Sequence, residues 1–192
     1  NSRYSPNSPY SASKASSDHL VNSWNHTYNL PTIITNCTNN FGPWQYPEKL
    51  IPVIINNALN EKIIPIYGDG KNIRDWLYVE DHINAIILVS QKGIIGNSYC
   101  IGAEEEKTNL ELAHAICKIL DEEKPSNYPH KNLIEFVEDR KGHDKRYAID
   151  PSKIKRELGW YPINSFEENI RSTVKWYIKN QLWSKKVKEI VY

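Results

Sequence analysis

Short apolar runs rich in β-branched residues alternate along this chain with longer segments of helical character. Residues 31–37 (PTIITNC) and 97–102 (NSYCIG) have the composition of buried strands. Residues 10–28 and 108–123 are predicted helices, and Thr108 is expected to cap the second. Strands that alternate with helices favour crossover connections. We therefore predict an α/β fold.

The segments between these elements give further local predictions. Residues 38–49 are expected to form a loop, because they are rich in Asn, Gly and Pro, and residues 48–60 a helix. Residues 63–79 are predicted to form two short strands around the turn at residues 68–70, as in a β-hairpin. Asp81 is a predicted N-cap. Residues 132–150 are expected to open as a strand and become a charged loop, and two helices, at 151–160 and 165–180, are expected to close the chain.

Composition excludes several classes of function. The net charge is +1, which argues against a nucleic-acid partner, and no apolar run is long enough to span a membrane. The three cysteines form no CxxC pair and the six histidines no HExxH motif, so we predict no metal site and no disulfide framework. Reduced thiols in a cytoplasmic protein are the expected state of the cysteines.

Tyr10 and Lys14 form the most suggestive local pattern. Residues four apart lie on one face of a helix, and the residues between these two are small, so a flat ligand could approach the backbone closely. An ammonium group one turn away favours the phenolate form of a tyrosine. Without further context, however, such a spacing also suits an ordinary helix start. The eight glycines form no GxGxxG phosphate-binding motif.

Several longer segments decide between these interpretations. The chain contains SPYSASKASSDHLV, TNCTNNFGP, PEKLIP, PIYGDGKNIRDWLYVEDH and DRKGHDKRYAID in this order. With these segments it resembles the extended short-chain dehydrogenase/reductase family, and within it the dehydratases that act on dTDP-glucose. The resemblance runs through nearly all 192 residues and favours a functional role for Tyr10 and Lys14.

The resemblance implies an NAD-binding Rossmann domain and a smaller domain that binds the sugar nucleotide. We expect residues 1–43 and 73–103 to form the C-terminal part of the first, and residues 44–72 and 104–192 the second. The phosphate-binding loop and the acidic residues that dehydrate the sugar are expected upstream of Asn1. The chain alone is then expected to be inactive, and the intact protein to be a homodimer.

The resemblance also implies roles for individual residues. Tyr10 is expected to take the proton of the sugar 4-hydroxyl while hydride leaves for NAD, and Lys14 to assist it and to hold the cofactor ribose. Asn40 is expected to face the cofactor. The expected substrate-binding residues are Asn39, Lys49, Leu50, Pro65, Ile66, Tyr67, Arg74, Asn109, Arg140 and His143. Arg74 and Arg140 would bind the diphosphate, because guanidinium groups suit phosphate oxygens.

One position departs from the family pattern, and other activities stay open. Lys141 stands where the family has proline, so the loop around it is expected to be less rigid. The alternatives to dehydration of dTDP-glucose are a related epimerase or decarboxylase, a dehydratase that uses another nucleotide, and a non-catalytic module that binds nucleotide sugars.

Overall fold

The computed structural model describes residues 4–140 and 142–191, so Lys141 and the first three residues of the predicted Rossmann segment lie outside it. The elements follow in the order α1 (Pro9–Tyr28), β1 (Ile34–Cys37), β2 (Asn39–Phe41), α2 (Leu50–Leu59), β3 (Ile64–Tyr67), β4 (Ile73–Tyr78), α3 (Val79–Lys92), β5 (Ser98–Ile101), β6 (Glu106–Thr108), α4 (Asn109–Glu123), the 3₁₀ turn η1 (His130–Leu133), β7 (Ile134–Val137), β8 (Arg146–Tyr147), α5 (Ser152–Leu158), α6 (Phe166–Lys179) and α7 (Gln181–Val191). The predicted α/β class is confirmed.

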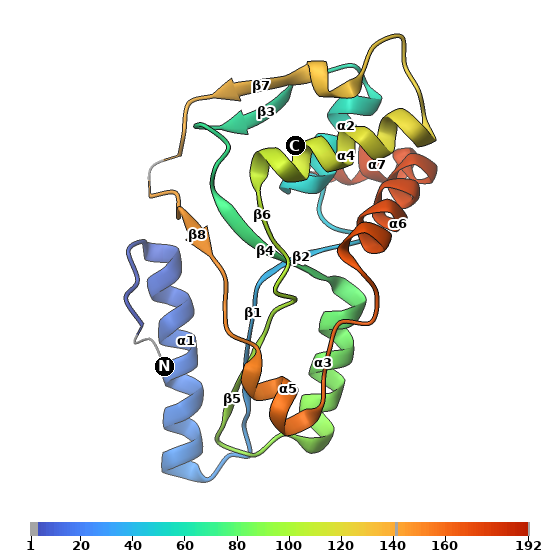
Figure 1. Ribbon diagram of the computed structural model, residues 1–192. Helices are drawn as coiled ribbons and strands as arrows, with labels where there is room; N and C mark the ends of the chain where they lie inside the picture. The colour runs from blue at the N-terminus through green and yellow to red at the C-terminus, as the bar shows by residue number, and fades with distance from the viewer. Residues whose placement is uncertain (1–3, 141, 192) are drawn as a thin grey trace.

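Three small sheets organise the described residues. β1 and β5 pair in parallel, and so do β3 and β7. The third sheet surrounds β4, which pairs in parallel with β2 and β8 and antiparallel with β6. Figure 1 shows α1, α3 and α5 near β1 and β5 at one end of the molecule, and α2, α4, α6 and α7 at the other. β4 and β2 run between the two ends.

Two hydrophobic cores match this arrangement. The larger core packs α2, α4 and α6 together and includes Phe41, Ile54, Leu112 and Val174. The smaller core consists of Leu77, Ala85, Val89, Tyr99, Ile101, Ile154 and Trp160. Its last two residues bring α5 and the segment after it against β5 and α3. Both cores draw residues from β4, and this strand therefore connects them.

Local capping explains several helix boundaries. Thr108 and Glu111 form a capping box at the start of α4, as predicted for Thr108, and Ser165 and Glu168 form another at the start of α6. In each box the hydroxyl accepts a bond from the backbone N–H three residues on, and the glutamate accepts from the N-cap N–H. None of the helices in the described part of the chain is long and apolar enough to span a membrane.

Four local predictions are wrong in detail. Part of the predicted loop at 38–49 is strand β2, because its backbone pairs with β4. The two strands around residues 68–70 exist, but they pair with other strands and form no hairpin. Asp81 is not an N-cap: α3 begins at Val79, and the Asp81 carboxylate instead accepts a hydrogen bond from the N–H of Ile163, at 3.0 Å. A third helix, α7, follows the two expected at the end.

Candidate functional site

The start of α1 presents Tyr10 and Lys14 to solvent. The side chain of Ser8 caps the helix by accepting a bond from the Ser11 N–H, and Pro9 occupies the first turn. This start places Tyr10 and Lys14 one turn apart, both exposed, and Tyr10 is 74% accessible. A ligand could therefore reach both side chains.

The serine hydroxyls of this turn bond to the backbone of their own helix. The hydroxyls of Ser13, Ser16 and Ser17 donate to the carbonyls of Tyr10, Ala12 and Ser13, at 2.7–3.0 Å. Because each hydroxyl is turned back onto its own helix, the backbone beside the tyrosine and lysine stays open to close approach.

A second tyrosine contacts the end of β1. Tyr147, on β8, donates a hydrogen bond from its hydroxyl to the carbonyl oxygen of Cys37, at 3.1 Å. Burial raises the pKa of Tyr147, and its neighbours Cys37, Cys100 and Tyr10 act in the same direction. Tyr147 was missed as a site residue, although it belongs to the quoted segment DRKGHDKRYAID, because that segment alone does not show where its tyrosine lies.

The end of β1 and the start of β2 bring Cys37 and Asn40 together. Burial raises the pKa of the Cys37 thiol, while the Asn40 amide and the Lys14 ammonium oppose this shift. Asn40 Nδ2 lies 3.0 Å from the carbonyl oxygen of Thr38 and 3.4 Å from Cys37 Sγ. The neighbouring Asn39 has a buried Oδ1 atom with no hydrogen-bond partner in the described residues. The structure thus places Asn40 beside Cys37.

The two predicted arginines come together at another place. Arg74 donates to the carbonyl oxygens of Ile73 and Asp144, at 2.7 and 2.8 Å. Burial lowers the pKa of the Arg74 guanidinium, Asp144 opposes this shift, and the nearby positive charge of Arg140 adds to it. Two guanidinium groups held near each other make a positive region that suits an anionic ligand.

Arg140 is positioned by neighbours that the sequence analysis also named. Its guanidinium lies over the ring of Tyr67, 5.0 Å from the ring centroid, and Nη2 donates to His143 Nε2, at 3.2 Å. Because arginine can only donate, the proton of a neutral His143 ring is on Nδ1, which donates to Asp139 at 2.7 Å. The hydrogen bond from His143 and a further one from the Arg140 N–H hold the pKa of Asp139 below its usual range.

The remaining predicted residues are more dispersed. On β3, Pro65 is half-buried and Ile66 is buried, so a ligand could contact Ile66 through its backbone. Lys49 precedes α2 and forms an ion pair with Glu48, and Leu50 begins that helix. Asn109 begins α4 and has a buried, unpartnered Oδ1 within the described structure. Among the described residues, no hydrogen bond joins Lys49 or Leu50 to Tyr10, Tyr147, Arg74 or Arg140.

The sequence model of a family described as GDP-mannose 4,6 dehydratase matches residues 1–173. The chain belongs to this family. A relative, the dTDP-glucose 4,6-dehydratase of Salmonella typhimurium, is 56% identical over 189 residues, which are 98% of this chain and 52% of the relative. The chain thus spans about half the length of the curated relatives it matches.

Solved structures agree with this membership. The dTDP-glucose 4,6-dehydratase of Bacillus anthracis, in complex with NAD, is 49% identical, with a TM-score of 0.87 over 95% of this chain and 56% of that one. The enzyme of the same name from Streptomyces venezuelae, with NAD bound, is 43% identical, with a TM-score of 0.90 over 97% of this chain and 56% of that one. The resemblance predicted from the sequence is confirmed.

Proposed function

We propose that this chain forms the C-terminal part of an NAD-dependent dehydratase that converts dTDP-glucose into dTDP-4-keto-6-deoxyglucose. The observation that carries the proposal is the pair Tyr10 and Lys14, which lie one turn apart and exposed at the start of α1. Relatives over half identical to the chain are named for this reaction. The missing part of the reaction centre would come from an N-terminal half like that of the relatives.

Tyr10 would act as the base in the first step. Its side chain is exposed, and Lys14 lies one turn away on the same face of α1. Tyr10 would accept the proton of the sugar 4-hydroxyl, and NAD, when bound, supplies the hydride acceptor. Lys14 and Asn40 fit a cofactor with ribose hydroxyls and an amide, because they offer an ammonium donor and a carboxamide.

The arginine pair would hold the substrate by its diphosphate. Arg74 and Arg140 provide planar donor groups, and Tyr67 beside Arg140 provides an aromatic face next to the nucleotide. His143, Pro65 and Ile66 would line the same region. Asn39, Asn109, Lys49 and Leu50 would contact the substrate from its other sides, and the unpartnered oxygens of the two asparagines are consistent with a ligand that donates hydrogen bonds.

The same proposal covers domains, assembly and location. We propose that residues 1–43 and 73–103 belong to the cofactor-binding domain, and residues 44–72 and 104–192 to the sugar-nucleotide domain. The exposed side chains of Leu20, Trp24 and Tyr28 on α1 would be covered in a cytoplasmic homodimer.

The test is Tyr10→Phe in the full-length protein. This change keeps the ring and removes the proposed base, so kcat should fall by about 10² or more. The melting temperature and NAD affinity should change little. Bound NADH is monitored by its absorbance, and the product is identified by mass spectrometry. A variant that reduces its cofactor at the wild-type rate would refute the proposed role. Epimerised or decarboxylated product from the wild type would favour the related enzymes, and nucleotide-sugar binding without turnover a binding module.

A further inference from the structure

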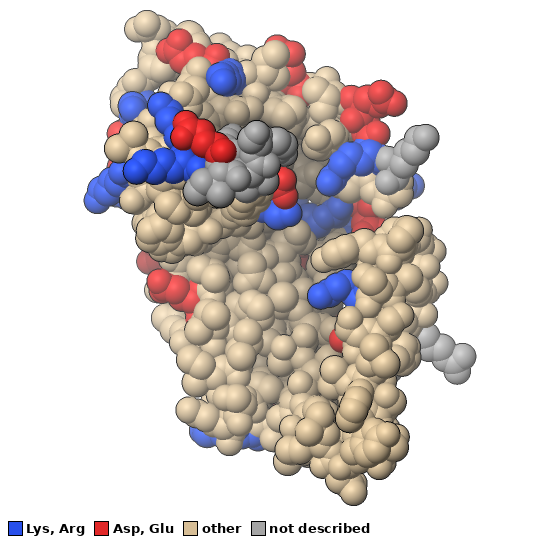
Figure 2. All heavy atoms as spheres, turned by 180° about the vertical axis from the view of Figure 1, so that it is seen from behind, with Lys and Arg blue, Asp and Glu red and all other residues tan. Residues whose placement is uncertain are grey.

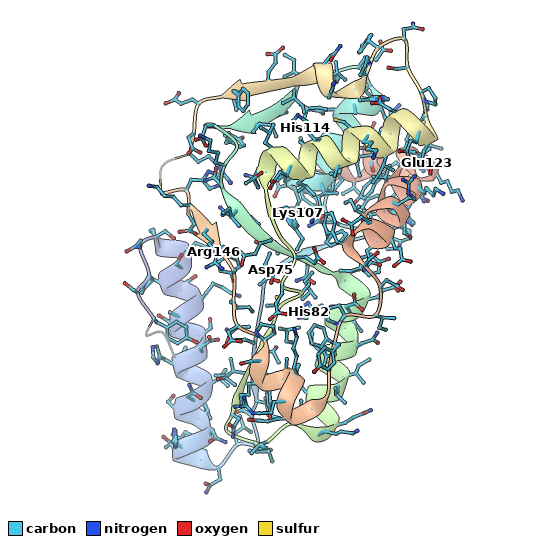
Figure 3. The ribbon with its side chains drawn as sticks, in the orientation of Figure 1. Asp75, His82, Lys107, His114, Glu123 and Arg146 are labelled. Atoms are coloured by element: carbon cyan, nitrogen blue, oxygen red, sulfur yellow. The ribbon has the colours of Figure 1, made fainter. Side chains whose placement is uncertain are left out.

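His82 lies at the first turn of α3 and contacts the side chain of Asn40. Figure 3 shows His82 beside the strands at the middle of the molecule. Its Nδ1 atom is 2.8 Å from Asn40 Oδ1. The two residues are 42 positions apart in the chain, so this contact exists only in the folded protein.

The other bonds of Asn40 determine the direction of this hydrogen bond. Asn40 Nδ2 donates to the carbonyl oxygen of Thr38, at 3.0 Å, so Oδ1 is the atom that faces the imidazole. A carboxamide oxygen can only accept, and His82 Nδ1 therefore carries a proton and donates it. Burial lowers the pKa of His82, which favours the neutral ring, and in that ring the bond to Asn40 Oδ1 places the proton on Nδ1.

The first turn of α3, which carries His82, is bonded to the segment that follows α5. The carbonyl oxygen of the preceding residue, Asp81, accepts a hydrogen bond from Trp160 Nε1, at 3.3 Å, and its carboxylate accepts the one from Ile163. Asp81 and Trp160 are both buried. The first turn of α3 is thus attached to the segment after α5, and this attachment limits the freedom of His82.

The end of β2, the strand that carries Asn40, is also held closely against α3. Gly42 has a φ of 149°, and a Cβ atom there would lie 2.6 Å from Val79 Cγ1, so glycine permits this approach. Gln45 Nε2 donates to the carbonyl oxygen of Asn40, at 2.8 Å. With its backbone and its carboxamide both bonded, Asn40 has one defined orientation beside Cys37.

We infer that His82 is a positioning residue that orients the Asn40 carboxamide and thereby shapes the cofactor side of the site. The inference rests on the proposed function, because it takes Asn40 as a cofactor-facing residue. His82 itself would touch neither cofactor nor substrate. Its effect would pass through the single hydrogen bond to Asn40 Oδ1.

The experiment is a double-mutant cycle in the full-length protein. The variants are His82→Leu, which removes the donor, His82→Asn, whose amide restores a donor, Asn40→Ala, and the double variant His82→Leu with Asn40→Ala. His114→Leu is the matched control, because His114 is an exposed histidine on α4. The measurements are the NAD dissociation constant by calorimetric titration, kcat and KM for dTDP-glucose, and the melting temperature.

We expect His82→Leu to weaken NAD binding about tenfold, within the range of coupling between contacting residues. His82→Asn should stay within about threefold of wild type, a rescue that loss of ring packing alone would not produce. The double variant should bind NAD no more weakly than Asn40→Ala, and His114→Leu should match wild type.

The outcomes separate this inference from the proposed function. Weaker binding in Asn40→Ala with no change in His82→Leu, or additive effects in the double variant, would overturn the role of His82 alone. No change in either single variant would overturn the cofactor role of Asn40 and the inference with it. If His82→Leu does not fold, His82→Asn is compared with His82→Asp, which has the same size but no amide donor. Equal NAD affinity of those two would overturn the inference.

Discussion

The hydroxyl of Tyr147 donates a hydrogen bond to the carbonyl oxygen of Cys37 across 110 positions of sequence. This bond ties β8, at the edge of the β4 sheet, to the end of β1. One hydrogen bond therefore joins two segments of the candidate site that are distant in the sequence.

Tyr147→Phe should lower the free energy of unfolding of the full-length protein by about 0.5–1.5 kcal/mol, the usual net value of one hydrogen bond. The ring is retained, so the loss should come from the hydroxyl. Urea denaturation followed by circular dichroism measures it. The control is Tyr161→Phe, because Tyr161 is 60% exposed. Equal stability of the two variants would mean that the bond to Cys37 contributes nothing.

Arg74→Ala and Arg140→Ala should each weaken binding of dTDP by about 1.5–3 kcal/mol, the range for charged hydrogen bonds. Titration calorimetry of the full-length protein measures the change. Arg156→Ala is the control, because Arg156 is an exposed arginine on α5 with an ion pair to Glu157. Unchanged affinity in both site variants would remove the arginines from the diphosphate site.

Cys117 should be nearly unreactive in the native state. Burial raises the pKa of its thiol to about 12, whereas a free cysteine titrates near 8.5. At pH 8 alkylation by iodoacetamide should thus be about 10³-fold slower than in urea, because the thiolate is the nucleophile. Mass spectrometry of the Cys117 peptide gives both rates. The folded state retains this proton longer than the unfolded state does, so the contribution of Cys117 to stability should be lost as the pH rises above about 8.5.

Residues 1–192 produced alone should self-associate and show no dehydration of dTDP-glucose. The side chains of Leu20, Trp24, Tyr28, Ile83 and Ile87 are 48–67% exposed on α1 and α3. Figure 2 shows the molecule from behind, and few charged side chains lie on the half of this view that contains α1. The sheet of β1 and β5 has two strands, which is too few for independent stability.

Light scattering after gel filtration measures the association, and the full-length protein is the control. A monomeric, active chain of residues 1–192 would contradict both the predicted association and the proposed need for an N-terminal half.

Features that depend on a few consecutive residues were predictable. The i, i+4 spacing places Tyr10 and Lys14 together on any helix, whatever surrounds it. The cap at Thr108 followed from residue type and from Glu111 three positions later. The alternation of apolar runs with helical segments determined the α/β class, because period and length are local properties of the chain.

Pairings between distant segments were decided only by the tertiary structure. The strands on either side of Gly70 pair elsewhere, since β3 finds a parallel partner in β7 and β4 finds one in β2. Tyr147 contacts Cys37, and His82 contacts Asn40, because of the positions at which β8 and α3 pack. No periodicity in the sequence predicts those positions. The spacing of Tyr10 and Lys14 is thus a local property of the sequence. The orientation of the other site residues depends on contacts that form when separate segments pack together.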